Sequence, residues 1–129
     1  MALVSRVWAP HSVNLVKPSG NGLIGALDTF SEINGDLIVT LAAEHRVPTV
    51  YAISCFAKRG GLMSYGPNTT DAVKRATAYV DSILRGEKPA ELPVRAPVKF
   101  DLVVNAKVAK ALGLTLPESF LLRADEVIE

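Results

Sequence analysis

The stretch GGLMSYGPN, residues 60–68, is the part of the sequence that decides how the chain around it folds. It opens with two glycines, and its middle has the composition of a short strand. Gly66-Pro67 is expected to end that strand in a turn, because proline fixes φ and has no N–H to donate to a sheet. A helix is expected to start at Asn68. Tyr65 is therefore placed where the backbone changes direction.

Upstream of this stretch the pattern alternates between strand and helix. Residues 22–27 form a short, nearly continuous apolar run, which is typical of a strand buried on both faces. A second run, 48–53, is rich in β-branched and aromatic residues, and between the two runs apolar residues recur at helical spacing over 34–46. Strand, helix and strand predict a βαβ unit. We therefore expect an α/β fold with a parallel, doubly wound, Rossmann-like sheet flanked by helices, to which 61–65 adds a strand.

Downstream, the strongest helical pattern covers residues 70–85 and ends before Gly86, a residue suited to the left-handed position after a helix. One side of this expected helix carries an apolar stripe, which consists of Val73, Ala76, Thr77, Val80, Ile83 and Leu84. A proline-rich, extended connection follows. A further strand is expected at 99–104, and two short helices are expected at 105–112 and 117–127.

Length and composition fit one globular domain. We expect residues 1–21 to be a weakly patterned N-terminal segment and 22–129 to be a single α/β lobe. The formal net charge is +1, from 14 basic and 13 acidic residues, so the charge favours neither nucleic acid nor a membrane surface as a partner. A single cysteine, Cys55, excludes an intramolecular disulfide. No apolar run reaches the roughly 18 residues that span a bilayer, so we expect no membrane insertion.

The motif G-x-G-x-x-G at residues 20–25 matches the dinucleotide-binding pattern in its letters. Dinucleotide binding requires a strand before the glycines and a helix that opens within them, whereas here the interior of the motif has the pattern of the strand. The two histidines, His11 and His45, are not spaced as metal ligands. No acid–base pair or activated nucleophile emerges. We therefore expect no catalytic residue, no metal and no cofactor, and a protein that is not an enzyme.

Polar and aromatic residues gather at the expected carboxyl ends of the strands, where open α/β sheets bind ligands. Their mixture of hydroxyl groups, aromatic rings and one carboxylate suits a small molecule with polar and apolar parts. In an alternative interpretation the aromatic residues simply fill the core, and the sequence leaves both interpretations open. The predicted ligand-binding residues are Asp28, Thr29, Phe30, Tyr51, Ser64 and Tyr65.

Several spaced segments resemble, in the same order, the substrate-binding proteins of ABC transporters. GGLMSYGPN is followed by YVDSILRGEKPAELPV at 79–94 and by KFDLVVN at 99–105, and it is preceded by GLIGALDTFSEINGDLIVTLAAEHRVPTVY at 22–51. The resemblance covers residues 20–129. More narrowly, these segments resemble the subgroup associated with aromatic amino acids and related small molecules.

The resemblance implies one lobe of a type I periplasmic binding protein, which binds a small molecule such as an amino acid without performing chemistry on it. It also implies an ABC transporter permease as the partner of the full-length protein and a periplasmic location, although the chain as it stands shows no signal sequence and is expected to be cytoplasmic. Proteins of this family have two lobes and more than twice as many residues. In them the segment that corresponds to 66–95 crosses to the first lobe and returns.

Without a first lobe, the apolar stripe of the expected helix 70–85 lacks its usual partner. An exposed stripe favours association, so we expect a homodimer in which this helix packs on its twin or is exchanged between subunits. One alternative is a monomer in which the helix covers its own sheet. Another alternative concerns function: a dimeric interaction module derived from the same family, in which the candidate residues pack a subunit interface and bind no ligand.

Overall fold

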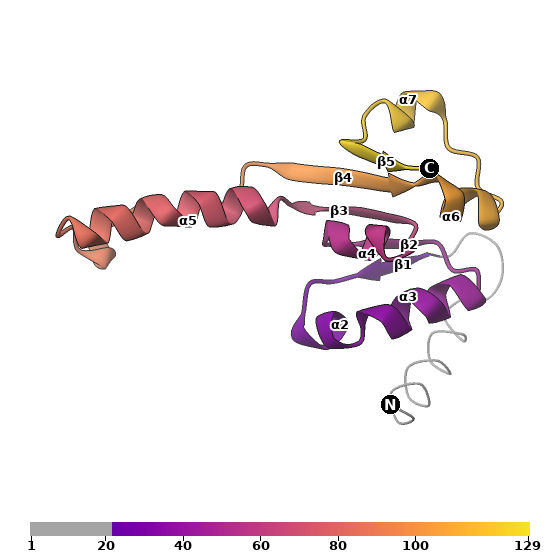
Figure 1. The fold of residues 1–129 in the computed structure, drawn as a ribbon, viewed down its shortest axis with the longest axis horizontal. Helices are drawn as coiled ribbons and strands as arrows, with labels where there is room; N and C mark the ends of the chain where they lie inside the picture. The colour runs from indigo at the N-terminus through magenta and orange to yellow at the C-terminus, as the bar shows by residue number, and fades with distance from the viewer. Residues whose placement is uncertain (1–21) are drawn as a thin grey trace.

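The structure is a computed structural model that describes residues 22–129 (Figure 1). What we expected of residues 1–21 lies outside this part of the chain. In chain order the elements are β1 (Leu23–Gly25), α2 (Thr29–Ile33), α3 (Gly35–Glu44), β2 (Thr49–Tyr51), α4 (Ser54–Lys58), β3 (Met63–Pro67), α5 (Thr69–Leu84), the short 3₁₀ helix η1 (Pro89–Glu91), β4 (Phe100–Asn105), α6 (Ala106–Ala111), α7 (Glu118–Leu121) and β5 (Glu126–Ile128).

One five-stranded sheet organises the molecule, and its strands lie side by side in chain order. β1, β2 and β3 run parallel, and β4 runs parallel to β5, but β4 is antiparallel to β3, with Gly66 opposite Asp101. The expected α/β fold is confirmed, with the difference that the sheet is mostly rather than entirely parallel. The antiparallel pair arises because the chain leaves the sheet through β3 and re-enters at the same edge through β4 (Figure 1).

The first strand is shorter and more exposed than its apolar sequence suggested. β1 covers only Leu23–Gly25 of the expected 22–27 and lies at the border of the sheet, and Ile24 is 83% exposed. The prediction of a strand buried on both faces is therefore wrong for β1, since its outward side chain meets no helix among the described residues. β2, α3, β4 and α6 lie where the sequence placed them.

The core lies between the sheet and the helices α3 and α4. Its centre is the ring pair of Tyr51 and Phe56, which stack at 5.1 Å between ring centroids and pack with Ile38 and Val39 of α3. A Cβ at Gly61 would come within 2.5 Å of the Tyr51 ring and 2.8 Å of the Phe56 carbonyl oxygen. The connection between α4 and β3 therefore requires glycine at this position, because any side chain would push the two rings away.

The end of β3 corrects one expectation about residues 60–68. The strand continues through Gly66 to Pro67, where we expected Gly-Pro to stop it. Proline is tolerated there because the next hydrogen bond to β4 is donated by the N–H of Asn68. Gly66 is required for another reason: a Cβ at this position would lie 1.8 Å from the carbonyl oxygen of Ala52, in the connection that follows β2.

The expected helix 70–85 is confirmed as α5, and it projects away from the sheet (Figure 1). Its N-cap is Asn68, whose side-chain oxygen accepts a hydrogen bond from the N–H of Asp71 at 2.7 Å. Gly86 follows the helix with a φ of 100°, as expected of a residue in the left-handed region. None of the 16 residues of α5 is buried. The alternative in which this helix covers its own sheet is therefore wrong.

The chain returns along one side of α5 after η1. The Tyr79 hydroxyl donates to the Pro93 carbonyl oxygen at 2.6 Å. The guanidinium of Arg95 lies 5.9 Å from the centre of the Tyr79 ring, which is the distance of a cation–π contact. These two contacts hold the returning segment against α5.

Near the C-terminus, the helix expected at 117–127 is wrong beyond its first turn. α7 ends at Leu121, and Glu126–Ile128 form β5 beside β4. Asp125 turns the chain into the sheet, because its N–H donates to the Leu102 carbonyl oxygen at 2.8 Å and its carboxylate accepts from the Leu102 N–H at 2.8 Å. Pairing with β4 overrides the local helical pattern.

Candidate ligand-binding site

Polar connections meet at one edge of the sheet. β1, β2 and β3 end there, and β4 and β5 begin there because they run antiparallel to the first three strands. α5 starts directly beyond this edge (Figure 1). Because ligands of open α/β sheets bind outside the carboxyl ends of the parallel strands, this edge is the candidate site.

A crevice of about 440 Å³ opens at this edge, between the end of β3 and the starts of β4 and β5. Its volume lies in the range of sites for small ligands. Apart from Val103, its lining side chains are all polar or charged. They are Ser54, Lys58, Asn68, Thr69, Thr70, Lys99, Asp101, Asp125 and Glu126. We call this feature the edge crevice.

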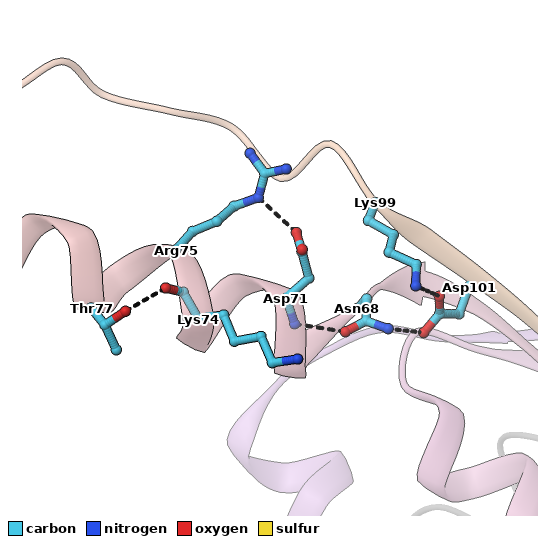
Figure 2. A network of polar contacts seen from close by, with 7 residues as sticks. All are labelled: Asn68, Asp71, Lys74, Arg75, Thr77, Lys99 and Asp101. Atoms are coloured by element: carbon cyan, nitrogen blue, oxygen red, sulfur yellow. Dashed lines mark hydrogen bonds and ion pairs between the residues drawn. The ribbon is translucent and has the colours of Figure 1, made fainter.

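Asn68 joins the sheet to α5 (Figure 2) and lines the edge crevice. Its amide nitrogen donates to Oδ2 of Asp101, while its amide oxygen accepts from the N–H of Asp71. Its own N–H donates to the carbonyl oxygen of Lys99 at 2.9 Å, and Lys99 Nζ lies 4.0 Å from Oδ1 of Asp101. One asparagine thus fixes the start of α5, holds the start of β4 and orients a carboxylate at the crevice.

The opposite wall carries charges of both signs. Lys58 of α4 forms an ion pair of 2.8 Å with Glu126 of β5, and the carboxylate of Asp125 is held by the Leu102 N–H. Three carboxylates and two ammonium groups therefore line the crevice, close to the positive end of the α5 dipole. Such a lining suits a ligand with a positive and a negative group. It lacks the apolar surface that completes most small-molecule sites.

Three predicted site residues, Asp28, Thr29 and Phe30, follow β1 at the same edge but outside the crevice. Asp28 is the N-cap of α2, and its carboxylate accepts from the N–H of Ser31 at 2.7 Å and from the Ser31 hydroxyl at 3.2 Å. All three predicted residues are exposed, Phe30 by 48%. They are accessible to a ligand, and their part in binding stays a prediction.

Tyr51 and Ser64 lie in the core, where they face each other across β2 and β3. Their exposed fractions are 2% and 1%, and neither hydroxyl has a hydrogen-bond partner among the described residues. Burial raises the pKa of the Tyr51 phenol above its ordinary value of 10.0, and contact with Thr49 lowers this pKa by a smaller amount. The Thr49 hydroxyl itself donates to the Val47 carbonyl oxygen. Core packing, the alternative interpretation, fits both Tyr51 and Ser64.

Tyr65 is 59% exposed and stacks on Phe100 of β4 at 5.8 Å between ring centroids. It does not line the edge crevice, which contains none of the six predicted residues. Asp101 escaped prediction because a strand expected to run parallel to β3 would begin at the far edge of the sheet. Asp125 escaped prediction because it fell within the helix expected at 117–127. The available signal was Asn68, a polar residue directly after a strand, which we interpreted only as a helix cap.

The crevice offers charged and hydrogen-bonding groups, which hold a polar molecule by non-covalent contacts. Within residues 22–129, no group of three or more His, Cys, Asp and Glu side chains is placed to hold a metal ion. Over the same part of the chain, no helix has the length and apolar character needed to cross a membrane.

Residues 11–128 match the family model of the ABC transporter substrate binding protein. The chain belongs to this family. ABC transporter substrate-binding proteins are non-catalytic, so the expectation that the chain is not an enzyme is confirmed. A comparison with curated proteins finds no match.

Solved structures with the same fold include three bacterial proteins. A conserved domain protein from Vibrio cholerae is 24% identical with a TM-score of 0.81, and 92% of this chain aligns with 40% of that one. An ABC domain from Streptococcus pneumoniae in complex with L-Trp is 24% identical with a TM-score of 0.84, covering 96% of this chain and 42% of that one.

The third is the ligand-free, open structure of a substrate binding protein with adhesive properties from Clostridium difficile. It is 21% identical with a TM-score of 0.64, and 92% of this chain aligns with 39% of that chain. The chain therefore spans about 40% of the length of the solved proteins that it matches. At these identities the likeness shows a shared fold.

Proposed function

We propose that residues 22–129 are the second lobe of a substrate-binding protein and that the edge crevice is this lobe's half of the ligand site. The observation that carries the proposal is the position of the crevice. It lies outside the carboxyl ends of the parallel strands, beside the point where the chain leaves through α5 and returns through β4. Residues 66–95 then form the crossing segment between the two lobes. The other lobe would close the open, polar crevice from the opposite side.

The proposed ligand is a small molecule such as an amino acid, bound without chemistry. Its ammonium group would meet the carboxylates of Asp101 and Asp125, and its carboxylate would meet Lys99 and the first turn of α5. Phe30 lies exposed at the same edge and offers a ring to an apolar side chain. An aromatic amino acid fits this set, and one structure with the same fold holds L-Trp. A transporter permease as partner and a periplasmic location complete the proposal.

A ligand screen tests this function directly. Because half a site binds weakly, amino acids are added in the millimolar range to the 129-residue chain, and the midpoint of thermal unfolding is recorded. Ligand at about ten times a dissociation constant of about 1 mM stabilises the folded state by about 1.4 kcal/mol. That gain raises the midpoint by a few degrees. If no amino acid shifts the midpoint at about 20 mM, the proposed function is contradicted.

Two lysine substitutions with the same charge change separate the crevice from the rest of the surface. Lys99→Met removes an ammonium group from the crevice, and Lys107→Met removes one from the exposed side of α6. We expect Lys99→Met to weaken ligand binding about fivefold, since a charged hydrogen bond in an open site contributes about 1 kcal/mol. Lys107→Met should bind as the wild type does. If both variants bind the ligand equally well, Lys99 is not part of the site.

We further propose that the chain forms a homodimer. The support is α5, whose 16 residues all remain accessible within the described part of the chain. The apolar side chains on it include Val73, Val80 and Leu84, and their exposure favours association. A molar mass of twice 13.8 kDa in solution would support this proposal.

A further inference from the structure

Asp101 is held at one of its two carboxylate oxygens and left open at the other. Its Oδ2 accepts a hydrogen bond from the amide nitrogen of Asn68 (Figure 2). Its Oδ1 lies 4.0 Å from Nζ of Lys99, which is beyond hydrogen-bonding distance and at the limit of an ion pair. Because Asp101 lines the edge crevice, Oδ1 is the oxygen that remains for a ligand in the crevice.

The other carboxylates of the edge crevice are held in different ways. Glu126 forms an ion pair of 2.8 Å with Lys58, which offsets its charge. Asp125 accepts from the backbone N–H of Leu102, a donor that does not depend on a side chain. Within the described part of the chain, Asp101 is the one of these three carboxylates that a neutral side chain orients. It therefore keeps its negative charge while its direction is fixed.

Asn68 is itself held in place by three further hydrogen bonds. Its amide oxygen accepts from the N–H of Asp71 at 2.7 Å, its backbone N–H donates to the Lys99 carbonyl oxygen at 2.9 Å, and its carbonyl oxygen accepts from the Ala72 N–H at 3.0 Å. A carboxamide turned by half a rotation would set its oxygen against the Asp101 carboxylate and its nitrogen against the Asp71 N–H. Both contacts would then be repulsive, so the amide nitrogen of Asn68 faces Asp101 in a fixed orientation.

A second carboxylate near Asn68 is drawn to another partner. Oδ2 of Asp71 accepts from Nε of Arg75 at 2.7 Å, one helical turn further along α5. The Asp71 carboxylate therefore points towards Arg75 and away from Asp101 (Figure 2). The negative charge that faces the amide nitrogen of Asn68 is that of Asp101.

The contact with Asp101 explains why asparagine occupies this N-cap position. Serine, threonine and aspartate also cap helices well, and each would accept from the N–H of Asp71. The hydroxyl groups of serine and threonine lie closer to the backbone than the amide nitrogen of Asn68, so they fall short of Asp101. Aspartate would set a second carboxylate against Asp101, and like charges repel. Among these four residues, asparagine caps the helix with its oxygen and also donates to Asp101 with its nitrogen.

We propose that Asn68 is a positioning residue for the ammonium group of the ligand and that it acts through Asp101. The inference rests on the proposed function, in which the ligand's ammonium group meets this carboxylate. By occupying Oδ2, Asn68 fixes the plane of the Asp101 carboxylate before the ligand arrives. A preorganised acceptor binds its donor more tightly, because less rotational freedom is lost on binding. Asn68 therefore favours ligands that carry an amino group.

Three indole probes with different charges test this inference on the 129-residue chain. L-tryptophan carries both an ammonium group and a carboxylate, tryptamine carries the ammonium group alone, and indole-3-propionate carries the carboxylate alone. Dissociation constants are measured from amide chemical shifts in NMR spectra, with each probe added up to about 20 mM. Asn68→Ser keeps a helix cap and releases Asp101, so it should weaken the binding of L-tryptophan and tryptamine about fivefold. The dissociation constant of indole-3-propionate should stay within about 1.5-fold of the wild-type value.

A double-mutant cycle shows whether Asn68 acts through Asp101. In the Asp101→Ala background, Asn68→Ser should change the dissociation constant of tryptamine by less than about 1.5-fold, because the carboxylate that Asn68 orients is gone. A residue that only stabilises the start of α5 would instead weaken all three probes alike and in both backgrounds. Circular dichroism verifies the fold of each variant, and Asn68→Thr, which also caps the helix, replaces Asn68→Ser if that variant does not fold.

Three results would overturn the inference. They are wild-type affinity of Asn68→Ser for tryptamine, an equal loss of affinity for all three probes, and an undiminished loss in the Asp101→Ala background. In each case the proposed function stands, because the wild type binds the probes. If the wild type binds neither L-tryptophan nor tryptamine at about 20 mM, the inference is overturned as well, and the wider screen of amino acids decides the proposed function by itself.

Discussion

Replacing Gly66 with alanine tests how closely β3 approaches the connection after β2. The added Cβ would lie 1.8 Å from the carbonyl oxygen of Ala52 and 2.8 Å from its carbonyl carbon. Ordinary van der Waals contact begins at 3.4 Å, so the clash is deep. Both clashing atoms belong to the backbone, and no change of side-chain rotamer can relieve them. The two backbone segments would have to separate within the sheet.

The cost follows from what must move. Overpacking costs about 1–3 kcal/mol when neighbouring atoms adjust, and separation of two hydrogen-bonded backbone segments belongs at or above the upper end of that range. We therefore expect Gly66→Ala to lose at least about 3 kcal/mol from the roughly 5–15 kcal/mol that stabilises a domain. In urea, with a slope of about 1.5 kcal/mol per molar, the midpoint should fall by about 2 M. Far-UV circular dichroism follows the transition.

Gly86→Ala is the matched control. Gly86 has a φ of 100°, but a Cβ there meets no atom within 4 Å. Its substitution should therefore cost only the backbone strain, about 1 kcal/mol. If the free energy of unfolding of Gly66→Ala lies within about 0.5 kcal/mol of the wild-type value, the close approach to Ala52 is refuted, together with our explanation of the glycine.

Two further substitutions test the junction and the core. Asn68→Ala removes the N-cap of α5 and the contact with Asp101, so the first turn should lose about 0.5–2 kcal/mol and its amides should exchange faster with solvent, while Thr70→Ala should not change them. Tyr51→Phe removes a buried hydroxyl that has no hydrogen-bond partner within residues 22–129, and it should leave stability equal or raise it by about 1 kcal/mol at neutral pH. Above about pH 10 the unfolded phenol ionises while the raised pKa of Tyr51 keeps the folded one neutral, so the wild type should lose stability as pH rises and Tyr51→Phe should lose less. Equal losses in urea midpoints at alkaline pH would contradict the linkage.

Local patterns predicted the elements whose causes are local. Asn68 and Asn105 each cap a helix with the side-chain oxygen, and Gly86 and Gly113 follow helices with positive φ. These features depend on a few neighbouring residues, which the sequence displays directly.

Features that depend on contacts between distant parts of the chain could not be predicted from the sequence. β5 exists because Leu102 and Asp125 exchange hydrogen bonds, and the contact between Gly66 and Ala52 reflects how two connections meet. The direction of β4 mattered most for the site, because it brings Asp101 to the edge where β3 ends. Strand direction follows from the path of α5, and a pattern of apolar residues along one strand does not encode it.

The hydrogen bond between Asn68 and Asp101 lies where α5 leaves the sheet, at the point about which the helix would rotate. The helix is about 24 Å long, so a rotation of roughly 10° at Asn68 displaces its far end by about 4 Å. Pairing over five residues between β3 and β4 keeps the strands at the base of α5 rigid. If the proposed ligand binds Asp101, any rotation that it causes at Asn68 is therefore enlarged at the far end of α5.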